Sequence, residues 1–154
     1  MTSSPETEKN SQRRDWLAVL ARAGRAELEK CVALLRDVPA FVAVRPAEAG
    51  MVMLRGRVGG TGDPFNLGEA SLTRCALRLA SGALGVGYAL GRDRRKAELI
   101  ALLDGLLQDP ARRASLMQEV VDPLRLAQAA RRDVASRAAA STRVDFFTLV
   151  RGEA

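Results

Sequence analysis

Hydrophobic and polar positions follow two different periods along this chain of 154 residues. In the first part, apolar residues recur every three or four positions, a spacing that is typical of amphipathic helices. A helix is therefore predicted over 13–23, with Ser11 as its N-cap and Gly24 at its end, and a second helix follows and ends before Pro39. The two stripes consist of Trp16, Leu17 and Leu20, and of Leu28, Cys31, Val32 and Leu35.

The period changes to two after Pro39, which predicts strands. The four predicted strands cover 41–45, 51–58, 72–80 and 84–90. A short turn around Ala47-Glu48-Ala49-Gly50 joins the first two strands, and a hairpin turn at Ser81-Gly82 joins the last two. Since strands joined by short turns pair antiparallel, the sheet is predicted to be antiparallel.

Helical spacing returns in the second half of the chain. Asp93 is the expected N-cap of a helix that Asp109-Pro110 ends, and further helices are predicted over 111–121 and 123–140. In the helix that Asp93 caps, the apolar stripe consists of Leu99, Leu102, Leu103 and Leu106. Because helices precede and follow the strands, the predicted fold class is α+β, a four-stranded antiparallel sheet packed on N- and C-terminal helices.

Length and composition fit one soluble domain. Hydrophobic residues make up 47% and charged residues 27% of the chain, which is ordinary for a globular protein. We expect a disordered polar leader over 1–12 and a single domain over 13–154. The uncharged stretch over 79–91 is shorter than the ~20 residues that a membrane span needs, and the leader has no signal-peptide core. A cytoplasmic protein without membrane contact is therefore expected.

The residue types that most often carry catalysis are scarce. Histidine, the commonest general base and metal ligand, is absent. The two cysteines, Cys31 and Cys75, are far apart and each lies among apolar residues, so we expect buried free thiols rather than a disulfide or a zinc site. No catalytic residue and no metal site are predicted.

The chain is basic, with 24 Lys and Arg residues against 18 Asp and Glu residues. Most of the basic residues are arginine, which binds phosphate and carboxylate groups through paired hydrogen bonds. Charge alone leaves a nucleic-acid-binding module as an alternative. However, acids alternate with the bases, and no basic stretch carries the aromatic residues on which nucleobases stack. Nucleic acid is therefore not the expected partner.

A glycine-rich loop and three arginines are the candidate phosphate or partner contacts. The loop reads Gly59-Gly60-Thr61-Gly62, and it lacks the Lys and the helix-opening Ser or Thr of a nucleotide P-loop. The arginines are Arg57, Arg74 and Arg92. One interpretation is a phosphate site in a stand-alone enzyme that handles phosphoryl or ribosyl groups. The other is a long turn in which several positions adopt positive φ.

Two further features predict a partner interface. In the last strand, Gly85 and Gly87 alternate with larger residues, and glycine in a strand favours close approach by another backbone. We interpret this pattern as an outer sheet face of small residues, edged by arginine, that another chain covers. The apolar C-terminal tail would aggregate if it were exposed, so we expect it to be buried in this fold or against a partner. Its candidate contacts are Arg143, Asp145, Phe146, Phe147 and Arg151.

Several of these segments together resemble PhnG, the G subunit family of the bacterial carbon–phosphorus lyase system. The likeness runs from Arg14 to Gly152. The segments that carry it are WLAVLA at 16–21, RPAEAG at 45–50, Gly59-Gly60-Thr61-Gly62, LTRCALRL at 72–79, Gly91-Arg92-Asp93, RVDFF at 143–147 and VRG at 150–152. Each segment alone is weak evidence, but their order and spacing together are specific.

The resemblance implies a subunit of a multi-protein complex for phosphonate catabolism. That system transfers an alkylphosphonate onto the ribose of ATP with displacement of adenine, and the methyl compound gives ribose 1-methylphosphonate 5-triphosphate. The implied partners are the H, I and J subunits, with direct contact to the I subunit, which is associated with the nucleosidase activity. An iron–sulfur cluster and S-adenosylmethionine belong to the J subunit, and no cofactor is implied for this chain. The family supplies no catalytic residue for this sequence, so the chain is expected to support the enzyme without being catalytic alone.

Overall fold

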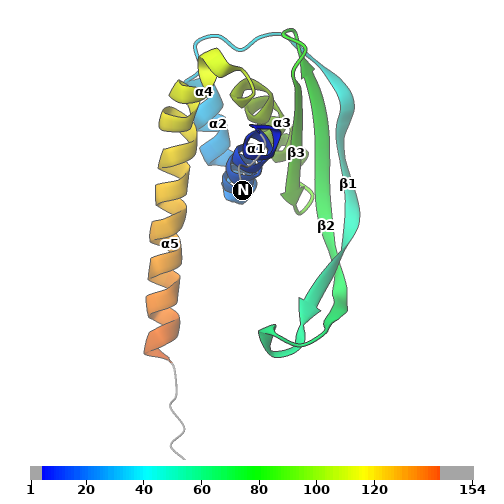
Figure 1. The fold of residues 1–154 in the computed structure, drawn as a ribbon, viewed down its shortest axis with the longest axis vertical. Helices are drawn as coiled ribbons and strands as arrows, with labels where there is room; N and C mark the ends of the chain where they lie inside the picture. Colours follow the sequence, from blue (N-terminus) through cyan, green and yellow to red (C-terminus); the bar gives the residue numbers. More distant parts are fainter. Residues whose placement is uncertain (1–4, 143–154) are drawn as a thin grey trace, which may run out of the picture.

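The computed structural model describes residues 5–142 and places helices on one side of an antiparallel sheet (Figure 1). The helices are α1 (Pro5–Arg22), α2 (Arg25–Ala33), α3 (Arg94–Leu107), α4 (Pro110–Leu116) and α5 (Asp122–Ser141). The strands are β1 (Phe41–Arg57), β2 (Pro64–Leu79) and β3 (Leu84–Leu90). A 3₁₀ turn, η1 (Val58–Gly60), follows β1, and a π-helical turn, η2 (Met117–Val121), joins α4 to α5. No helix within residues 5–142 has the length and apolar character needed to cross a membrane.

The α+β class and the antiparallel pairing are confirmed, but the prediction of four strands is wrong. The sheet has the order β1-β2-β3, because the first two predicted strands are parts of one 17-residue strand, β1. In place of the turn predicted over 47–50, β1 has register shifts between Ala43 and Arg45 and between Arg45 and Glu48. Such bulges absorb extra residues without ending the pairing, and Pro46 is tolerated because β1 is an edge strand.

Two local predictions about turns and caps are confirmed. The Ser81-Gly82 turn joins β2 to β3, with Gly82 at a φ of 87°. At the start of α3, the Asp93 carboxylate accepts a hydrogen bond from the Lys96 N–H at 2.9 Å. These short-range features depend on a few neighbouring residues, which is why the sequence pattern predicts them well.

The helices agree with the prediction except at the N-terminus. The helix predicted over 111–121 corresponds to α4 with η2, and the one predicted over 123–140 corresponds to α5. However, α1 begins at Pro5 rather than at 13, so residues 5–12, expected in the disordered leader, are helical. The side chains of residues 7–12 are exposed. The first part of α1 therefore has no apolar stripe from which a helix would be predicted.

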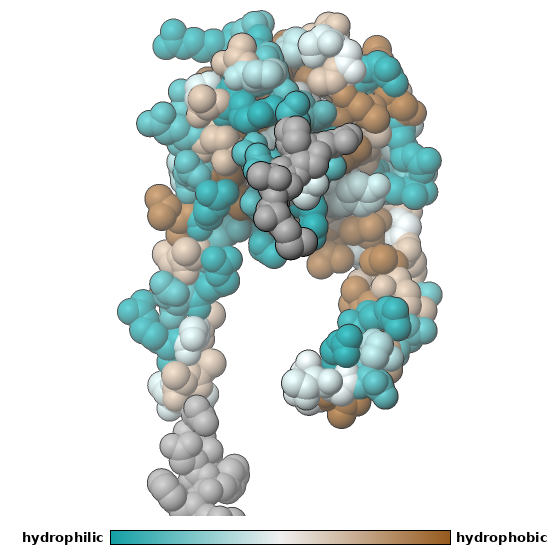
Figure 2. All heavy atoms as spheres, in the orientation of Figure 1, coloured by the Kyte–Doolittle hydropathy of each residue, from teal (hydrophilic) through white to brown (hydrophobic). Residues whose placement is uncertain are grey.

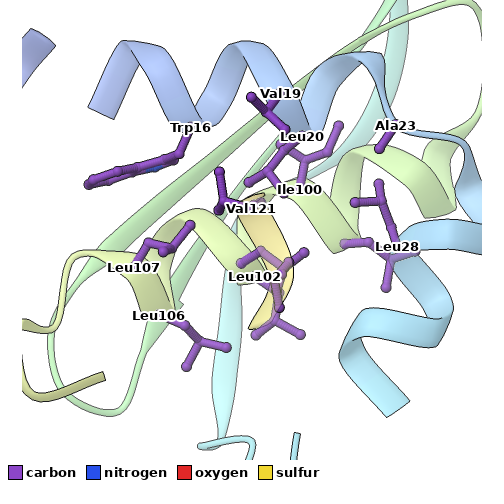
Figure 3. Packing of buried hydrophobic residues seen from close by; sticks show 14 of the residues in the cluster. Trp16, Val19, Leu20, Ala23, Leu28, Ile100, Leu102, Leu106, Leu107 and Val121 are labelled. Atoms are coloured by element: carbon purple, nitrogen blue, oxygen red, sulfur yellow. The ribbon is translucent and has the colours of Figure 1, made fainter. Parts of the chain in front are cut away.

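Helix α3 forms the centre of the hydrophobic core. It lies between the sheet and the remaining helices (Figure 1), and nearly every residue from Ala97 to Leu107 is buried. The core cluster joins α3 to Trp16 and Leu20 of α1 and to Leu28 of α2 (Figure 3). Because α3 is covered on most of its circumference, it needs apolar residues at almost every position, and its leucine-rich sequence supplies them.

The β1–β2 hairpin projects from this body as an arm. Strand β3 pairs with β2 only from Leu72 to Arg78, whereas β2 begins at Pro64 instead of the predicted 72. Residues 50–70, which we call the arm, therefore form a two-stranded ribbon and its connecting loop, and none of them is buried. In Figure 1 the arm extends below the body as the lower end of β1 and β2.

The second projection is the C-terminal part of α5. Its first half is attached to the body, where Leu124 is buried and the Gln128 amide donates to the Val19 carbonyl at 2.9 Å. From residue 130 to residue 142 every side chain is exposed. This segment is rich in alanine, the residue with the highest helix propensity, so the helix continues without packing support. Figure 2 shows open space between α5 and the arm.

An ion pair attaches α5 to α2. The Arg131 guanidinium donates to the Glu27 carboxylate at 2.9 Å. The same carboxylate accepts a hydrogen bond from the Gly24 N–H at 2.7 Å, at the start of α2. The Arg131 hydrogen bond, followed by the Gly24 bond, holds the pKa of Glu27 below its ordinary value of 4.5.

We expect Glu27→Gln to lower the free energy of unfolding by up to about 1 kcal/mol at neutral pH. A carboxylate whose folded-state pKa is lowered stabilises the fold above its unfolded pKa, and this stabilisation is lost as the pH falls through the folded pKa. Thermal denaturation of both proteins should therefore show a Tm difference that is full at neutral pH and disappears in strongly acid solution. A Tm difference that stays constant with pH would contradict the assignment.

Candidate functional site

The glycine stripe of β3 lies on the inner face of the sheet, against α3. Gly85 and Gly87 are buried, and a Cβ atom on them would collide with the backbone carbonyl oxygens of Ala101 and Ala97 respectively. The prediction that these glycines form an exposed outer face for a partner is therefore wrong. The pattern does indicate close backbone approach, but the approaching backbone is a helix of this same chain.

The outer face of the sheet carries larger residues, and none of the helices within residues 5–142 covers it (Figure 1). The register places Tyr88 beside Arg74 and Leu90 beside Leu72, and Tyr88 and Leu90 are exposed. The Arg74 guanidinium donates to the Glu48 carboxylate at 2.8 Å. This hydrogen bond is the main reason why the pKa of Glu48 lies below its ordinary value. The guanidinium of Arg74, a candidate phosphate contact, is therefore paired with a carboxylate at the surface.

The glycine-rich loop is the tip of the arm. Gly59 and Gly60 have φ angles of 59° and 83°, so the prediction of a turn with positive-φ positions is confirmed. Arg57 belongs to this tip, because its guanidinium donates to the Gly62 carbonyl at 3.0 Å. This bond ties the start of the loop to its end, and residues 57–61 of the tip are exposed.

The other two candidate arginines lie away from the tip. Arg57 pairs with Pro64 in the hairpin, whereas Arg74 is ten positions further along β2, a distance of about 30 Å in an extended strand. Arg92 lies in the connection between β3 and α3. The structure therefore does not bring Arg57, Arg74 and Arg92 together around the loop. The predicted tail contacts Arg143, Asp145, Phe146, Phe147 and Arg151 lie outside the described residues.

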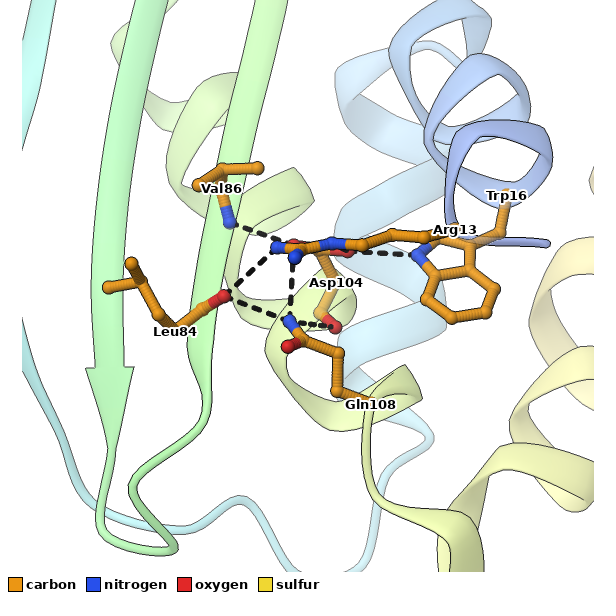
Figure 4. A network of polar contacts seen from close by, with 6 residues as sticks. All are labelled: Arg13, Trp16, Leu84, Val86, Asp104 and Gln108. Atoms are coloured by element: carbon orange, nitrogen blue, oxygen red, sulfur yellow. Dashed lines mark hydrogen bonds and ion pairs between the residues drawn. The ribbon is translucent and has the colours of Figure 1, made fainter. Parts of the chain in front are cut away.

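A buried carboxylate that the sequence pattern did not single out organises the centre of the molecule (Figure 4). Asp104 of α3 is fully buried. Arg13 donates to both of its oxygens, through Nε at 3.1 Å and through a terminal nitrogen at 2.7 Å. The Trp16 indole N–H donates to the same carboxylate at 2.9 Å. These bonds connect α1 to α3. The signal that could have revealed the site is a single carboxylate within the otherwise uncharged run from Leu99 to Leu107.

The same network closes part of the free edge of β3. The Val86 N–H donates to Asp104 at 2.9 Å. The Leu84 carbonyl accepts bonds from Arg13 at 3.0 Å and from Gln108 at 2.9 Å. Unpaired backbone groups on an edge strand invite pairing with other chains. Here side chains of α1 and α3 satisfy them at the start of β3.

The two cysteines have no environment that would activate a thiolate. Both are free thiols, Cys75 buried and Cys31 partly buried. Burial raises the pKa of each thiol, and a nearby carboxylate, Glu98 for Cys75 and Glu27 for Cys31, raises it further. A raised pKa lowers the thiolate fraction, so neither residue is placed as a nucleophile.

A surface hollow of about 700 Å³ lies between the end of α2 and helices α3 and α4. Leucines form much of its lining, and an ion pair from Arg112 to Asp37 at 2.7 Å contributes the polar part. Ser115 in its wall donates its hydroxyl to the Arg112 carbonyl at 3.0 Å. That hydroxyl is therefore bonded to a backbone acceptor rather than to a side-chain base, and the hollow offers no nucleophile–base pair.

Together these features define a class of protein. The core is complete around α3, but a hairpin arm and an uncovered sheet face expose apolar residues to solvent. In residues 5–142, neither the hollow nor the cysteines present an activated catalytic group. Exposed apolar surface of this extent is typical of a protein that binds other proteins.

Comparisons with known proteins specify the family. The family model for the phosphonate metabolism protein PhnG matches residues 11–152. A similar protein from Rhizobium meliloti (strain 1021), the alpha-D-ribose 1-methylphosphonate 5-triphosphate synthase subunit PhnG, is 46% identical over 147 residues, which cover 93% of this chain and 91% of the relative. The chain belongs to the PhnG family of phosphonate metabolism proteins.

Proposed function

We propose that this chain is the G subunit of a ribose 1-methylphosphonate 5-triphosphate synthase and that its role in that enzyme is structural. In this role it holds other subunits in the arrangement that transfers an alkylphosphonate onto the ribose of ATP and displaces adenine. The observation that carries the proposal is the 46% identity, over nearly the full length of both chains, to a subunit of that synthase.

The structure supports the non-catalytic part of the proposal. The candidate arginines do not converge on the glycine loop, and Arg74 is paired with Glu48. The cysteine thiols have raised pKa values. A stand-alone enzyme for phosphoryl or ribosyl transfer would need several charged groups directed at one point. The loop Gly59-Gly60-Thr61-Gly62, at the end of an exposed arm, is better suited to contact a partner.

The proposed partners are the H, I and J subunits of the system, with direct contact to the I subunit. ATP is then a substrate of the complex, and the iron–sulfur cluster and S-adenosylmethionine belong to the J subunit. This chain binds no cofactor of its own, and the complex works in the cytoplasm. The tail residues Phe146 and Phe147 are retained as proposed partner contacts.

An adenine-release assay tests this proposal. With ATP and methylphosphonate, the purified chain alone should release no adenine, because it has no catalytic constellation. The H, I and J subunits without this chain should release little, and adding the chain should restore the reaction. Adenine release by the chain alone, or full release without it, would contradict the proposed role.

A further inference from the structure

The arm is a two-stranded ribbon without a packed face of its own. A two-stranded ribbon usually needs a third strand or a packed face for independent stability. In the arm, β3 is absent, and no residue from 50 to 70 is buried. The arm nevertheless continues the β1–β2 pairing as far as the Arg57–Pro64 pair, with one register shift between Leu54 and Arg55. The continued pairing together with the missing cover indicates that another surface completes the arm.

One face of the arm is apolar. Val52 and Leu54 point to the same side of β1, opposite Ala70 and Gly68. Beyond the register shift between Leu54 and Arg55, a Cβ atom on Gly56 would lie 3.5 Å from the Phe65 ring and 3.9 Å from the Leu67 Cβ, so these residues share that side. Leu54, Phe65 and Leu67 are 39%, 42% and 64% exposed. This face carries no charged residue.

The opposite face is mixed and basic. Alternation along β1 places Met51, Met53, Arg55 and Arg57 on this side, with Glu69 across from Met53. Both methionines are exposed. Among the residues that the structure describes, neither arginine forms an ion pair. This face therefore offers two guanidinium groups and two flexible apolar side chains.

The apolar face continues onto the uncovered side of the sheet. The register carries it from Ala70 to Leu72, and Leu72 pairs with Leu90. Leu90 is 67% exposed, and Tyr88, two residues away on the same side, is also exposed. We call the exposed residues of this surface the docking strip. The docking strip consists of Leu54, Phe65, Leu67, Tyr88 and Leu90. Figure 2 shows hydrophobic residues on the sheet and at the end of the arm.

We propose that the arm inserts into a groove on another subunit of the synthase, with an apolar wall against the docking strip and an acidic wall against Arg55 and Arg57. The inference rests on the proposed function, because it takes the occupant to be a partner in that complex. Two copies of this chain that met through their docking strips would leave Met51, Met53 and both arginines in water. A groove covers both faces, and carboxylates in one wall match the arginines. Aromatic and arginine side chains are the residues most often found as binding anchors.

A shortened arm tests the inference. Residues 53–69 are replaced by Asn-Gly, which joins the paired residues Val52 and Ala70 by a two-residue turn. Since the removed residues contribute nothing to the core, the variant should keep its far-ultraviolet circular dichroism and a cooperative thermal transition. The probe is tagged recovery from cells that co-express the H, I and J subunits. We expect recovery of the partner subunits with wild type and at least a tenfold loss with the shortened variant.

Point variants provide the matched comparison. Leu67→Glu and Leu90→Glu change the docking strip, whereas Leu126→Glu changes a leucine of α5 that is 71% exposed. Each strip variant should weaken assembly by about tenfold, which corresponds to about 1.4 kcal/mol. Leu126→Glu should assemble like wild type. Arg55→Glu should also weaken assembly, because it reverses the charge that faces the acidic wall.

The outcomes separate this inference from the proposed function. If wild type does not recover the H, I or J subunits, the proposed function fails, and the inference fails with it. If wild type and the shortened variant recover them equally, the chain is still a subunit and only the arm inference is overturned. If light scattering shows that the isolated chain is a dimer that the shortened arm converts to a monomer, the occupant is a second copy and the inference is overturned.

Discussion

Replacing Gly87 with Ala is expected to lower the free energy of unfolding by about 3 kcal/mol. A Cβ atom at this position would overlap the Ala97 carbonyl oxygen and lie 2.9 Å from the Ala101 nitrogen. Both atoms belong to the backbone of α3, so they cannot move aside as the end of a side chain can. Helix α3 would have to shift away from β3, and the core around it would lose contacts. Urea denaturation should show a large fall in the midpoint.

Gly50→Ala is the matched control. Gly50 also lies in a strand, but a Cβ atom there has nothing within 4 Å. Its φ is not positive, so alanine fits without strain and should be neutral or slightly stabilising. A Gly87→Ala midpoint equal to that of Gly50→Ala would show that the glycine stripe does not determine how closely α3 packs.

Replacing Asp104 with Ala is expected to cost about 3 kcal/mol of stability, because it removes one member of a buried ion pair. The Trp16 and Val86 N–H groups would lose their acceptor inside the core. Arg13 would lose both of its bonds to the carboxylate, although its side chain is partly exposed and can still reach water. Tryptophan fluorescence during urea unfolding reports on the site directly, since Trp16 is the single tryptophan of the chain.

Glu98→Ala is the control on the same helix. Glu98 forms a surface ion pair with Arg95 at 3.3 Å, and such pairs contribute at most about 0.5–1 kcal/mol. Its replacement should therefore leave the unfolding midpoint nearly unchanged. If Asp104→Ala and Glu98→Ala had equal effects, the Asp104 network would not be what holds α1 against α3.

The parts of the fold that the sequence predicts well depend on neighbouring residues. The Asp93 cap, the Ser81-Gly82 turn and the leucine stripe of α3 are each determined by residues close together in the sequence. The α+β class follows from the order of helical and alternating segments. The family resemblance is confirmed by the match over residues 11–152.

The wrong predictions concern which part of the structure packs against a strand and where a strand ends. Alternation in β3 identifies two faces, but it does not say whether the glycine face meets a partner or the chain's own α3. In β1, Pro46 and Gly50 predict a turn, whereas bulges against β2 keep the strand continuous. Both outcomes are decided by contacts far along the chain, which a local pattern does not contain.

The candidate site was predictable only in part. The positive-φ glycines of the loop are visible in the sequence, but the position of that loop at the end of an arm depends on the length of the β1–β2 pairing. Asp104 is the single charged residue between Leu99 and Leu107 of α3, and its partners come from two other elements, α1 and β3. The separation of Arg57, Arg74 and Arg92 also follows from the long hairpin.

Hydrogen–deuterium exchange of this chain, free and assembled with the H, I and J subunits, is the most direct measurement of how it works. If the arm is seated in a groove of a partner, exchange across residues 50–70 slows on assembly, while exchange in α4 stays the same. Equal exchange of the arm in the free and assembled chain would contradict the account, because the arm would then remain in solvent inside the complex.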